Sequence, residues 1–260
     1  MCTCSWIRSR SATGAETGYD VMFNRDEQWS RKPALLPRLH VRNGARFIAP
    51  VDADAGGTWI GVNAFGVSVA LLNRYQDSTP PPATSAGFTS RGQLVRNLLD
   101  ARAAGEVHSR IESLEQEIGR FQPFTLLVLE TGMAALLIEW SGKTLSIDED
   151  ADKQMPLASS SFEPSAAIAY RRELLARLSN GQPSVESLRA FHASREPGRA
   201  PYGPCMERDD AHTVSFSWIR VRPEQISFEY MPMSLCDAAE QTGHAQPFSV
   251  SITPAAAYRV

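Results

Sequence analysis

Strand-like apolar runs dominate both ends of the chain, and helical patterns lie between them. The first two runs, "CTCSWIRS" (residues 2–9) and "YDVMFNRDE" (residues 19–27), are separated by a polar segment that contains glycine, which predicts a β-hairpin. A second hairpin is predicted around the turn of residues 63–66 in "TWIGVNAFGVSVALLNRY". Further strands are expected in residues 124–131, 134–142 and 143–149, and a last hairpin in residues 213–232.

Helical periodicity is confined to two blocks in the middle of the chain. Residues 89–105 place apolar side chains on one face, and Gly105 is a stop signal. Basic, proline-containing residues 30–43 are expected to form a loop, as are the proline-rich residues 79–87. Further helices are expected in residues 107–119, 164–180 and 184–194.

The segregation of strands from helices predicts an α+β fold with antiparallel sheets covered by helices. The nearly continuous apolar runs "LLVLE" and "AALLIEW" are typical of strands that are buried on both faces. A four-layer αββα sandwich satisfies both observations. With 260 residues, a single domain over residues 1–260 is expected.

Composition and charge restrict the possible partners. The chain is 43% hydrophobic and 21% charged with a net charge of −3, so no basic face for nucleic acid is expected. No apolar run reaches the roughly 20 residues that span a bilayer, and no secretory signal is recognisable, which favours the cytoplasm. The four cysteines are too few and too scattered for a disulfide framework or a metal site, and no cofactor is predicted.

Cys2 is the first candidate for chemistry. If Met1 is removed, Cys2 carries a thiol and an α-amine, whose pKa of roughly 7.7–8.0 lets it act as a base toward that thiol. A separate histidine is then unnecessary, and no histidine of this sequence has an obvious Asp or Asn relay. The alternative is that Cys2 is a small buried side chain, the usual role of free cysteine.

Four polar residues follow the second run directly, namely Asn24, Arg25, Asp26 and Glu27. A carboxylate near the α-amine would stabilise its charged form, and a guanidinium near the thiol would favour the thiolate. We therefore expect Cys2 to be alkylated before the other cysteines. The alternative is a pair of exposed charges that end the hairpin.

An oxyanion needs amide or backbone donors, and Asn73 ends an apolar strand where it could supply one. The alternative is that Asn73 begins the following turn. Gly56 and Gly57 precede Trp59 and would permit a close backbone approach, although a plain turn explains them equally well.

The segments "MCT", "NRDE", "GGTWIGVNAFGVSVALLN" and "SRGQLV" together resemble the NRDE family, the group that includes transport and Golgi organisation protein 2. The resemblance covers the first hundred residues and weakens afterwards. That family looks like a branch of the N-terminal nucleophile hydrolases, similar to the penicillin V acylase and bile salt hydrolase group. The resemblance implies an αββα sandwich and a terminal cysteine that attacks an amide.

The same resemblance implies site residues. Carried over by position, the catalytic set is Cys2, Arg25, Asp26 and Asn73. In the acylases the Arg and the Asp are separated by two residues, whereas here they are adjacent and should face opposite sides of the sheet unless the strand bulges. Asp26 is the preferred partner of Cys2. Candidate substrate-binding residues are Asn24, Glu27, Trp59, Ser159, Ser160 and Arg208.

The later part of the chain departs from these families. Where the acylases supply a second Asn, this sequence offers Ser159 or Ser160, and where NRDE relatives often have an Arg, it has Asp210, with Arg208 two residues earlier.

Three functions therefore stay open. The first is a cysteine hydrolase that cleaves a linear amide of a small N-acyl substrate. The second is a non-catalytic carrier of an acyl-CoA, lipid or haem ligand, as the family's links to such ligands imply. The third is a protein whose NRDE segment only stabilises the first hairpin.

Overall fold

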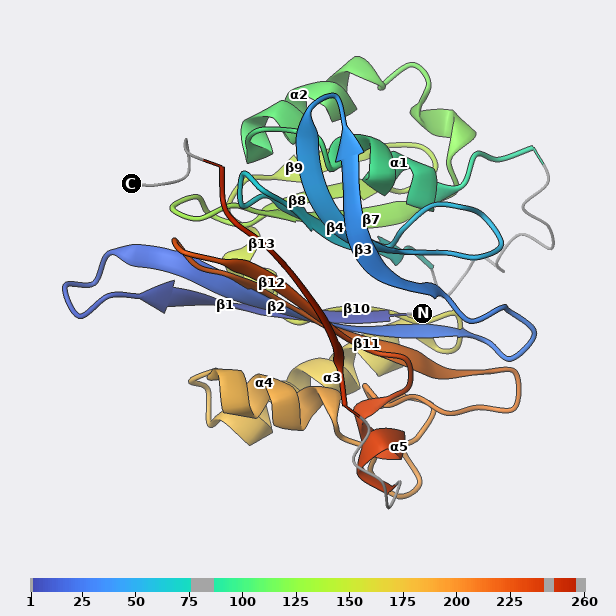
Figure 1. Ribbon diagram of the computed structural model, residues 1–260. Helices are drawn as coiled ribbons and strands as arrows, with labels where there is room; N and C mark the ends of the chain where they lie inside the picture. Colours follow the sequence, from blue (N-terminus) through green and yellow to red (C-terminus); the bar gives the residue numbers. More distant parts are fainter. Residues whose placement is uncertain (1, 76–86, 241–245, 256–260) are drawn as a thin grey trace.

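Residues 2–75, 87–240 and 246–255 are described by a computed structural model in which two antiparallel sheets pack face to face between two layers of helices (Figure 1). The six-stranded sheet A consists, in spatial order, of β10 (Leu157–Ser159), β1 (Cys2–Arg10), β2 (Glu16–Gln28), β11 (Ala211–Val221), β12 (Ile226–Met231) and β13 (Phe248–Ile252). The seven-stranded sheet B consists of β3 (Leu35–Arg42), β4 (Ala45–Val51), β5 (Ile60–Asn63), β6 (Ser68–Asn73), β7 (Phe124–Leu129), β8 (Leu136–Trp140) and β9 (Leu145–Asp148). The predicted αββα sandwich is confirmed.

Helices cover the outer face of each sheet (Figure 1). Sheet B carries α1 (Arg91–Leu98) and α2 (Ala104–Ser113), and sheet A carries α3 (Pro164–Ser179) and α4 (Val185–His192). The short α5 (Leu235–Glu240) follows β12, and single 3-10 turns are formed by Ile118–Arg120 and Ala151–Gln154. Among the described residues, no helix is both long and apolar enough to cross a membrane.

The core has three parts, one in each interface between layers. Side chains of Trp6, Phe23 and Ile60 meet between the two sheets. A second cluster lies between sheet B and its helices, and a third lies between sheet A and its helices. Because strand residues alternate between faces, odd and even positions of β1 reach different layers. Cys2, Cys4 and Trp6 face sheet B, whereas Thr3 and Ser5 contact the helices.

The first prediction that the structure corrects concerns residues 30–43, which we expected to form a loop. They contain strand β3 at the edge of sheet B. Pro37 and the exposed side chains of Leu39 and Val41 hide the strand pattern. An edge strand tolerates them, because one of its sides needs no backbone donor and its side chains need not be buried. The ladder to β4 is irregular between Leu35 and Arg38, where Pro37 interrupts it.

The helix expected in residues 89–105 is also corrected. α1 ends at Leu98, and Gly105 is the second residue of α2 and not a stop. The side-chain amide of Asn63 donates to the carbonyls of Leu99 and Ala101 at 3.2 and 2.6 Å, so a tertiary contact satisfies the end of α1. The other predicted helices and hairpins are present, and most of the predicted loop of residues 79–87 lies outside the described residues.

Candidate active site

Cys2 lies in the middle of a row of side chains that crosses sheet A. The register pairs Cys2 with Arg25 of β2 on one side and with Ser159 of β10 on the other, and Arg25 pairs in turn with Ser215 of β11. Directly opposed residues of antiparallel strands share a face, and Cys2 belongs to the cluster between the sheets. The row Ser159–Cys2–Arg25–Ser215 therefore faces sheet B.

Arg25 is held in place from the opposite sheet. Its guanidinium lies over the Trp59 ring, 4.2 Å from the ring centre. Its Nη2 donates to Asp52 at 2.7 Å and to Glu27 at 3.2 Å. Burial alone would raise the pKa of Asp52, but hydrogen bonds from the Ala55 and Asp54 amides and the charge of Arg25 hold it below its usual value. The charge of Arg25 is thus paired with two carboxylates.

A close approach of two backbones places Trp59 above the row. A Cβ atom on Gly57 would lie 2.4 Å from the carbonyl carbon of Gly92, and the Thr58 amide donates to the Gly92 carbonyl at 3.0 Å. Only glycine at position 57 allows this contact, which docks the start of α1 beside Trp59. The close approach that the Gly56–Gly57 pair suggested is therefore confirmed for Gly57.

Several buried polar atoms, on this face of sheet A and on Trp59 opposite it, have no partner among the described residues. The Ser159 and Ser217 hydroxyls and the Trp59 indole nitrogen make no hydrogen bond to any described residue. Ser217 pairs with Phe23 and so shares the face of the row. Because buried polar atoms are nearly always satisfied, such atoms around Cys2 indicate a place where water or a polar ligand can bind.

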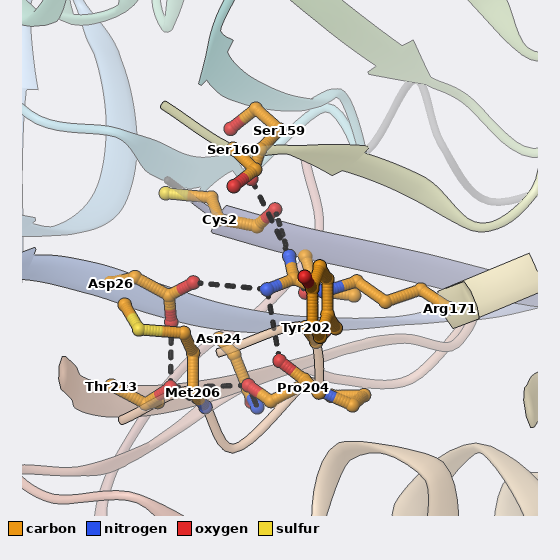
Figure 2. Close-up of polar contacts among 12 residues, drawn as sticks. Cys2, Asn24, Asp26, Ser159, Ser160, Arg171, Tyr202, Pro204, Met206 and Thr213 are labelled. Carbon is orange, nitrogen blue, oxygen red and sulfur yellow. Dashed lines mark hydrogen bonds and ion pairs between the residues drawn. The ribbon is translucent and has the colours of Figure 1, made fainter. Parts of the chain in front are cut away.

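Asp26 lies on the other face of sheet A, as the alternation along β2 requires. Its Oδ1 accepts a hydrogen bond from the Thr213 hydroxyl at 2.6 Å, and its Oδ2 lies 3.5 Å from Nη2 of Arg171 on α3. Figure 2 shows this ion pair below Cys2 in the view. Burial raises the pKa of Asp26, and the charge of Arg171 opposes that rise.

Arg171 joins Asp26 to the backbone of Cys2. Its guanidinium, which is 0% exposed, donates to the Cys2 carbonyl at 3.1 Å and to the Thr3 hydroxyl at 2.8 Å. It also donates to the Tyr202 and Gly203 carbonyls, each at 2.9 Å (Figure 2). Asp26, the preferred partner of Cys2, is therefore linked to it through Arg171 and the Cys2 carbonyl. Arg25 lies on the same face of the sheet as the thiol.

Asn24 lies on the helix side of sheet A, opposite the face of the Cys2 thiol. Its amide nitrogen donates to the carbonyls of His192 and Pro204 at 2.9 and 2.8 Å, and its Oδ1 lies 3.0 Å from His192 Nδ1. The other ring nitrogen of His192 lies 2.8 Å from the Ser5 hydroxyl. These three side chains are fully buried on the helix side of sheet A. We had expected no histidine with such a relay, and this one is structural.

The stability that His192 provides should depend on pH. Burial lowers the pKa of His192 from 6.5 to about 3, so the folded protein keeps the ring neutral while the unfolded chain takes up a proton below about pH 6.5. The stabilisation of the folded protein by the neutral His192 ring is therefore present above pH 6.5 and is lost as the pH falls toward 3. In urea titrations, the stability gap between wild type and His192→Gln should narrow over that range. A gap that is equal at pH 7 and pH 5 would contradict this. The comparison uses the gap because the raised pKa of Asp26 acts in the opposite direction.

Asn73 lies at the end of β6, a strand that packs against β1 and β10. Its side-chain nitrogen donates to the Tyr75 hydroxyl at 3.1 Å. The nitrogen has two hydrogens, and only one of them has an acceptor among the described residues.

Ser160 and Arg208 take part in local structure. The Ser160 hydroxyl donates to the Phe162 carbonyl at 2.5 Å. Arg208 binds Asp210 through two hydrogen bonds of 2.9 and 2.8 Å and lies over the Phe162 ring. Arg208 and Asp210 therefore form a pair with each other, so Arg208 does not take the place of an arginine at position 210.

Burial opposes the expected activation of the Cys2 thiol. Burial raises the pKa of Cys2, and the charge of Arg25 does not offset it. Burial also raises the pKa of Cys4. The cysteine whose pKa is lowered is Cys236, next to Cys205. That Cys2 is alkylated before the other cysteines stays a prediction for the chain that lacks Met1.

Sequence reasoning missed Arg171, Asp52 and Thr213. Arg171 had a signal, because it lies on the buried stripe of α3 with Ala167 and Leu174, where an apolar residue is expected. Asp52 and Thr213 meet the NRDE segment only through the tertiary fold. Within the ranges that the structure describes, no group of three or more His, Cys, Asp or Glu side chains could hold a metal ion.

Known proteins with the same architecture include amidases. The structure is similar to the Caenorhabditis elegans orthologue of N-acylethanolamine-hydrolyzing acid amidase, with 15% identity, a TM-score of 0.50 and coverage of 95% of this chain and 99% of that one. A mutant of the conjugated bile acid hydrolase from Clostridium perfringens gives 11% identity, a TM-score of 0.51 and coverage of 97% and 92%. Penicillin V acylase from Agrobacterium tumefaciens gives 14% identity, a TM-score of 0.49 and coverage of 90% and 84%.

At these identities, the likeness to the first two establishes a shared fold and nothing more. None of the curated proteins compared with the sequence matches it. The sequence profile described as Transport and Golgi organisation 2 matches residues 5–192, which is most of the chain. The chain therefore belongs to the Transport and Golgi organisation 2 family.

Proposed function

We propose that the protein is a cysteine hydrolase that cleaves the linear amide bond of a small N-acyl substrate, with Cys2 as its nucleophile. The observation that carries the proposal is the row that crosses sheet A. Cys2 lies between Arg25 and Ser159, and the buried hydroxyl of Ser159 has no hydrogen-bond partner among the described residues. The amidase neighbours support a hydrolase of this fold.

The reaction begins with the removal of Met1, which lies outside the described residues. The freed α-amine of Cys2 takes the thiol proton, and the sulfur forms a bond to the carbonyl carbon of the substrate. The carbonyl oxygen becomes an oxyanion that accepts hydrogen bonds from the Asn73 amide and the Ser159 hydroxyl. The carbon–nitrogen bond breaks, the leaving amine takes the proton from the α-amine, and water then hydrolyses the thioester.

Arg25 and Asp26 have separate roles in this proposal. Arg25 faces the thiol and favours the thiolate, while its stacking on Trp59 shapes the wall of the site. Asp26 acts on the other side of the strand, where Arg171 links it to the Cys2 carbonyl. Glu27 orients Arg25.

The raised pKa of Cys2 favours a second candidate function, a non-catalytic carrier of an acyl-CoA, lipid or haem ligand. A buried and protonated thiol is a poor nucleophile. The two functions differ in whether a covalent bond to sulfur forms. The cytoplasm remains our proposed location.

The test exposes protein lacking Met1 to N-acyl amino acids, acyl-CoA thioesters and haem, and follows product release and ligand affinity side by side. A hydrolase releases a free acid from at least one amide. Tight binding of haem or acyl-CoA with no released acid from any substrate would favour the carrier and exclude the hydrolase.

Asn73→Ala should lower kcat by about 10²-fold, because one principal oxyanion donor is lost. KM should change little, since the donor acts mainly on the transition state. Steady-state kinetics on the best N-acyl substrate provide the measurement. Tyr75→Phe is the matched control, as it removes only the partner hydroxyl of Asn73. Equal kinetics of Asn73→Ala and wild type would exclude Asn73 as an oxyanion donor.

A further inference from the structure

Two cysteines that the proposed chemistry does not use meet at the end of α4. The Cys205 thiol donates to the His192 carbonyl at 3.2 Å, and the Cys236 thiol donates to the Ala193 carbonyl at 3.0 Å. Because these carbonyls belong to consecutive residues, the two thiols share one small space, and each thiol affects the pKa of the other. Both cysteines are in the reduced form.

The two thiols differ in accessibility and in charge environment. Cys205 is 0% exposed, whereas Cys236, on α5, is 8% exposed. Arg195 lies beside both, with a hydrogen bond of 3.5 Å from its Nε to the Cys205 carbonyl and one of 2.9 Å from Nη2 to Asp237. A nearby cation favours the thiolate, and Cys236 is the less deeply buried of the two thiols. Cys236 is therefore suited to react first and Cys205 to react second.

The direction of each pKa agrees with this order. The neighbouring Cys205 thiol and the charge of Arg195 lower the pKa of Cys236. The pKa of Cys205 is raised, because its contact with Cys236 and its burial both oppose its ionisation. The pair thus contains one thiol that ionises readily and one that keeps its proton.

We propose that Cys205 and Cys236 form a redox-active dithiol that closes to an intramolecular disulfide when a peroxide or a low-molecular-weight disulfide is the oxidant. With hydrogen peroxide, the Cys236 thiolate attacks one oxygen, and the products are a sulfenic acid and hydroxide. The Cys205 sulfur then attacks the Cys236 sulfur, so that the S–O bond breaks. The hydroxyl leaves with the Cys205 proton as water, two thiols are oxidised, and one peroxide is reduced to two waters.

With a low-molecular-weight disulfide, the Cys236 thiolate breaks the S–S bond and releases one small thiol. Cys205 then displaces the second small thiol from the mixed disulfide. A reducing cytoplasm reverses the reaction, which makes such a bond transient and suited to sensing.

The position of Cys205 connects this dithiol to the candidate active site. Residues 202–204 supply backbone carbonyls to the supports of Cys2 and Asp26: Tyr202 and Gly203 accept from Arg171, and Pro204 accepts from Thr213 (Figure 2). A disulfide would tie the next residue in this segment to α5. Oxidation therefore affects the segment of residues 202–204, which supports the Arg171–Asp26 pair. It does not contact the row Ser159–Cys2–Arg25–Ser215, which lies on the other face of sheet A.

The experiment treats the full-length protein with hydrogen peroxide or oxidised glutathione, alkylates the remaining thiols, and maps all four cysteines by mass spectrometry. In wild type, we expect Cys205 and Cys236 to be protected together with a mass loss of two hydrogens, and dithiothreitol to restore both. In Cys205→Ser, Cys236 should instead carry one glutathione. In Cys236→Ser, Cys205 should stay alkylatable.

Cys4→Ser is the matched control, because Cys4 is also buried but lies in another layer, and it should leave the disulfide unchanged. Joint protection of Cys205 and Cys236 does not require any hydrolase activity, so its outcome is independent of the proposed function. A Cys236 that is oxidised beyond the sulfenic acid while Cys205 stays alkylatable would overturn the proposal, as would a disulfide that involves Cys2 or Cys4.

Discussion

Replacing Arg171 with methionine is expected to lower the free energy of unfolding by about 3–5 kcal/mol, the usual cost of removing one partner of a buried ion pair. The Asp26 carboxylate would lose the only cation paired with it among the described residues, and the Cys2, Tyr202 and Gly203 carbonyls would lose a donor. Methionine keeps most of the side-chain volume, so the loss reports on polar contacts. Urea denaturation at pH 7 provides the measurement.

Arg222 is the matched control for this substitution. It also donates to backbone carbonyls, those of Tyr19 and Val221, and it pairs with Asp20 of β2 at 2.5 Å. Its own side chain is about a third exposed, and the buried Asp20 keeps a hydrogen bond from the Trp218 indole at 2.8 Å, so Arg222→Met should cost less than Arg171→Met. An equal loss in the two variants would contradict the special role of Arg171.

A second comparison separates charge from packing. Asp26→Asn combined with Arg171→Met leaves no unpaired buried charge, so the double variant should recover part of the stability lost by Arg171→Met alone. A double variant that loses the sum of both single effects would show that the two side chains act independently.

The largest effect on activity is expected from Cys2→Ser, which should lower turnover of an N-acyl substrate by at least about 10³-fold, because the hydroxyl is a far weaker nucleophile than the thiolate. The free energy of unfolding should change little, since one sulfur is replaced by one oxygen at a buried strand position. Initial rates and urea titrations of the same preparation test both statements.

Cys4→Ser provides the control for Cys2→Ser. Cys4 lies two residues along β1, faces the same core and is also buried. Its substitution should affect stability to a similar degree and leave turnover intact. If both serine variants keep wild-type turnover, the nucleophile is not Cys2.

The first half of the site could be predicted from local sequence because it depends on strand alternation and one hairpin. The run that begins at Cys2 and the run that ends in the NRDE segment are joined by a short turn, so pairing them brings Cys2 opposite Arg25. The same alternation predicted that Arg25 and Asp26 would face opposite sides, and the structure has them so. The alternation alone did not decide whether Arg25 or Asp26 faces the thiol, because that depends on which face of sheet A meets sheet B.

The remaining supports could not be predicted, since they arrive from distant parts of the chain. Arg171 comes from a helix that begins after β10, and Asp52 comes from the loop after β4. The pairing of Cys205 with Cys236 depends on where α5 packs, and no spacing in the sequence encodes it. The burial that raises the pKa of Cys2 likewise depends on sheet B and not on the residues beside Cys2.

In the proposed reaction, Cys2 becomes the terminal residue and attacks an acyl group. Mass spectrometry of protein purified from its native host tests it most directly, before and after brief incubation with a p-nitrophenyl acyl ester and an acid quench. The good leaving group makes acylation fast, so the acyl-enzyme accumulates. We expect a chain that lacks Met1 and carries one acyl group on Cys2 after the incubation. The Cys2→Ser variant should carry no acyl group. A chain that retains Met1 and stays unacylated at Cys2 would contradict it.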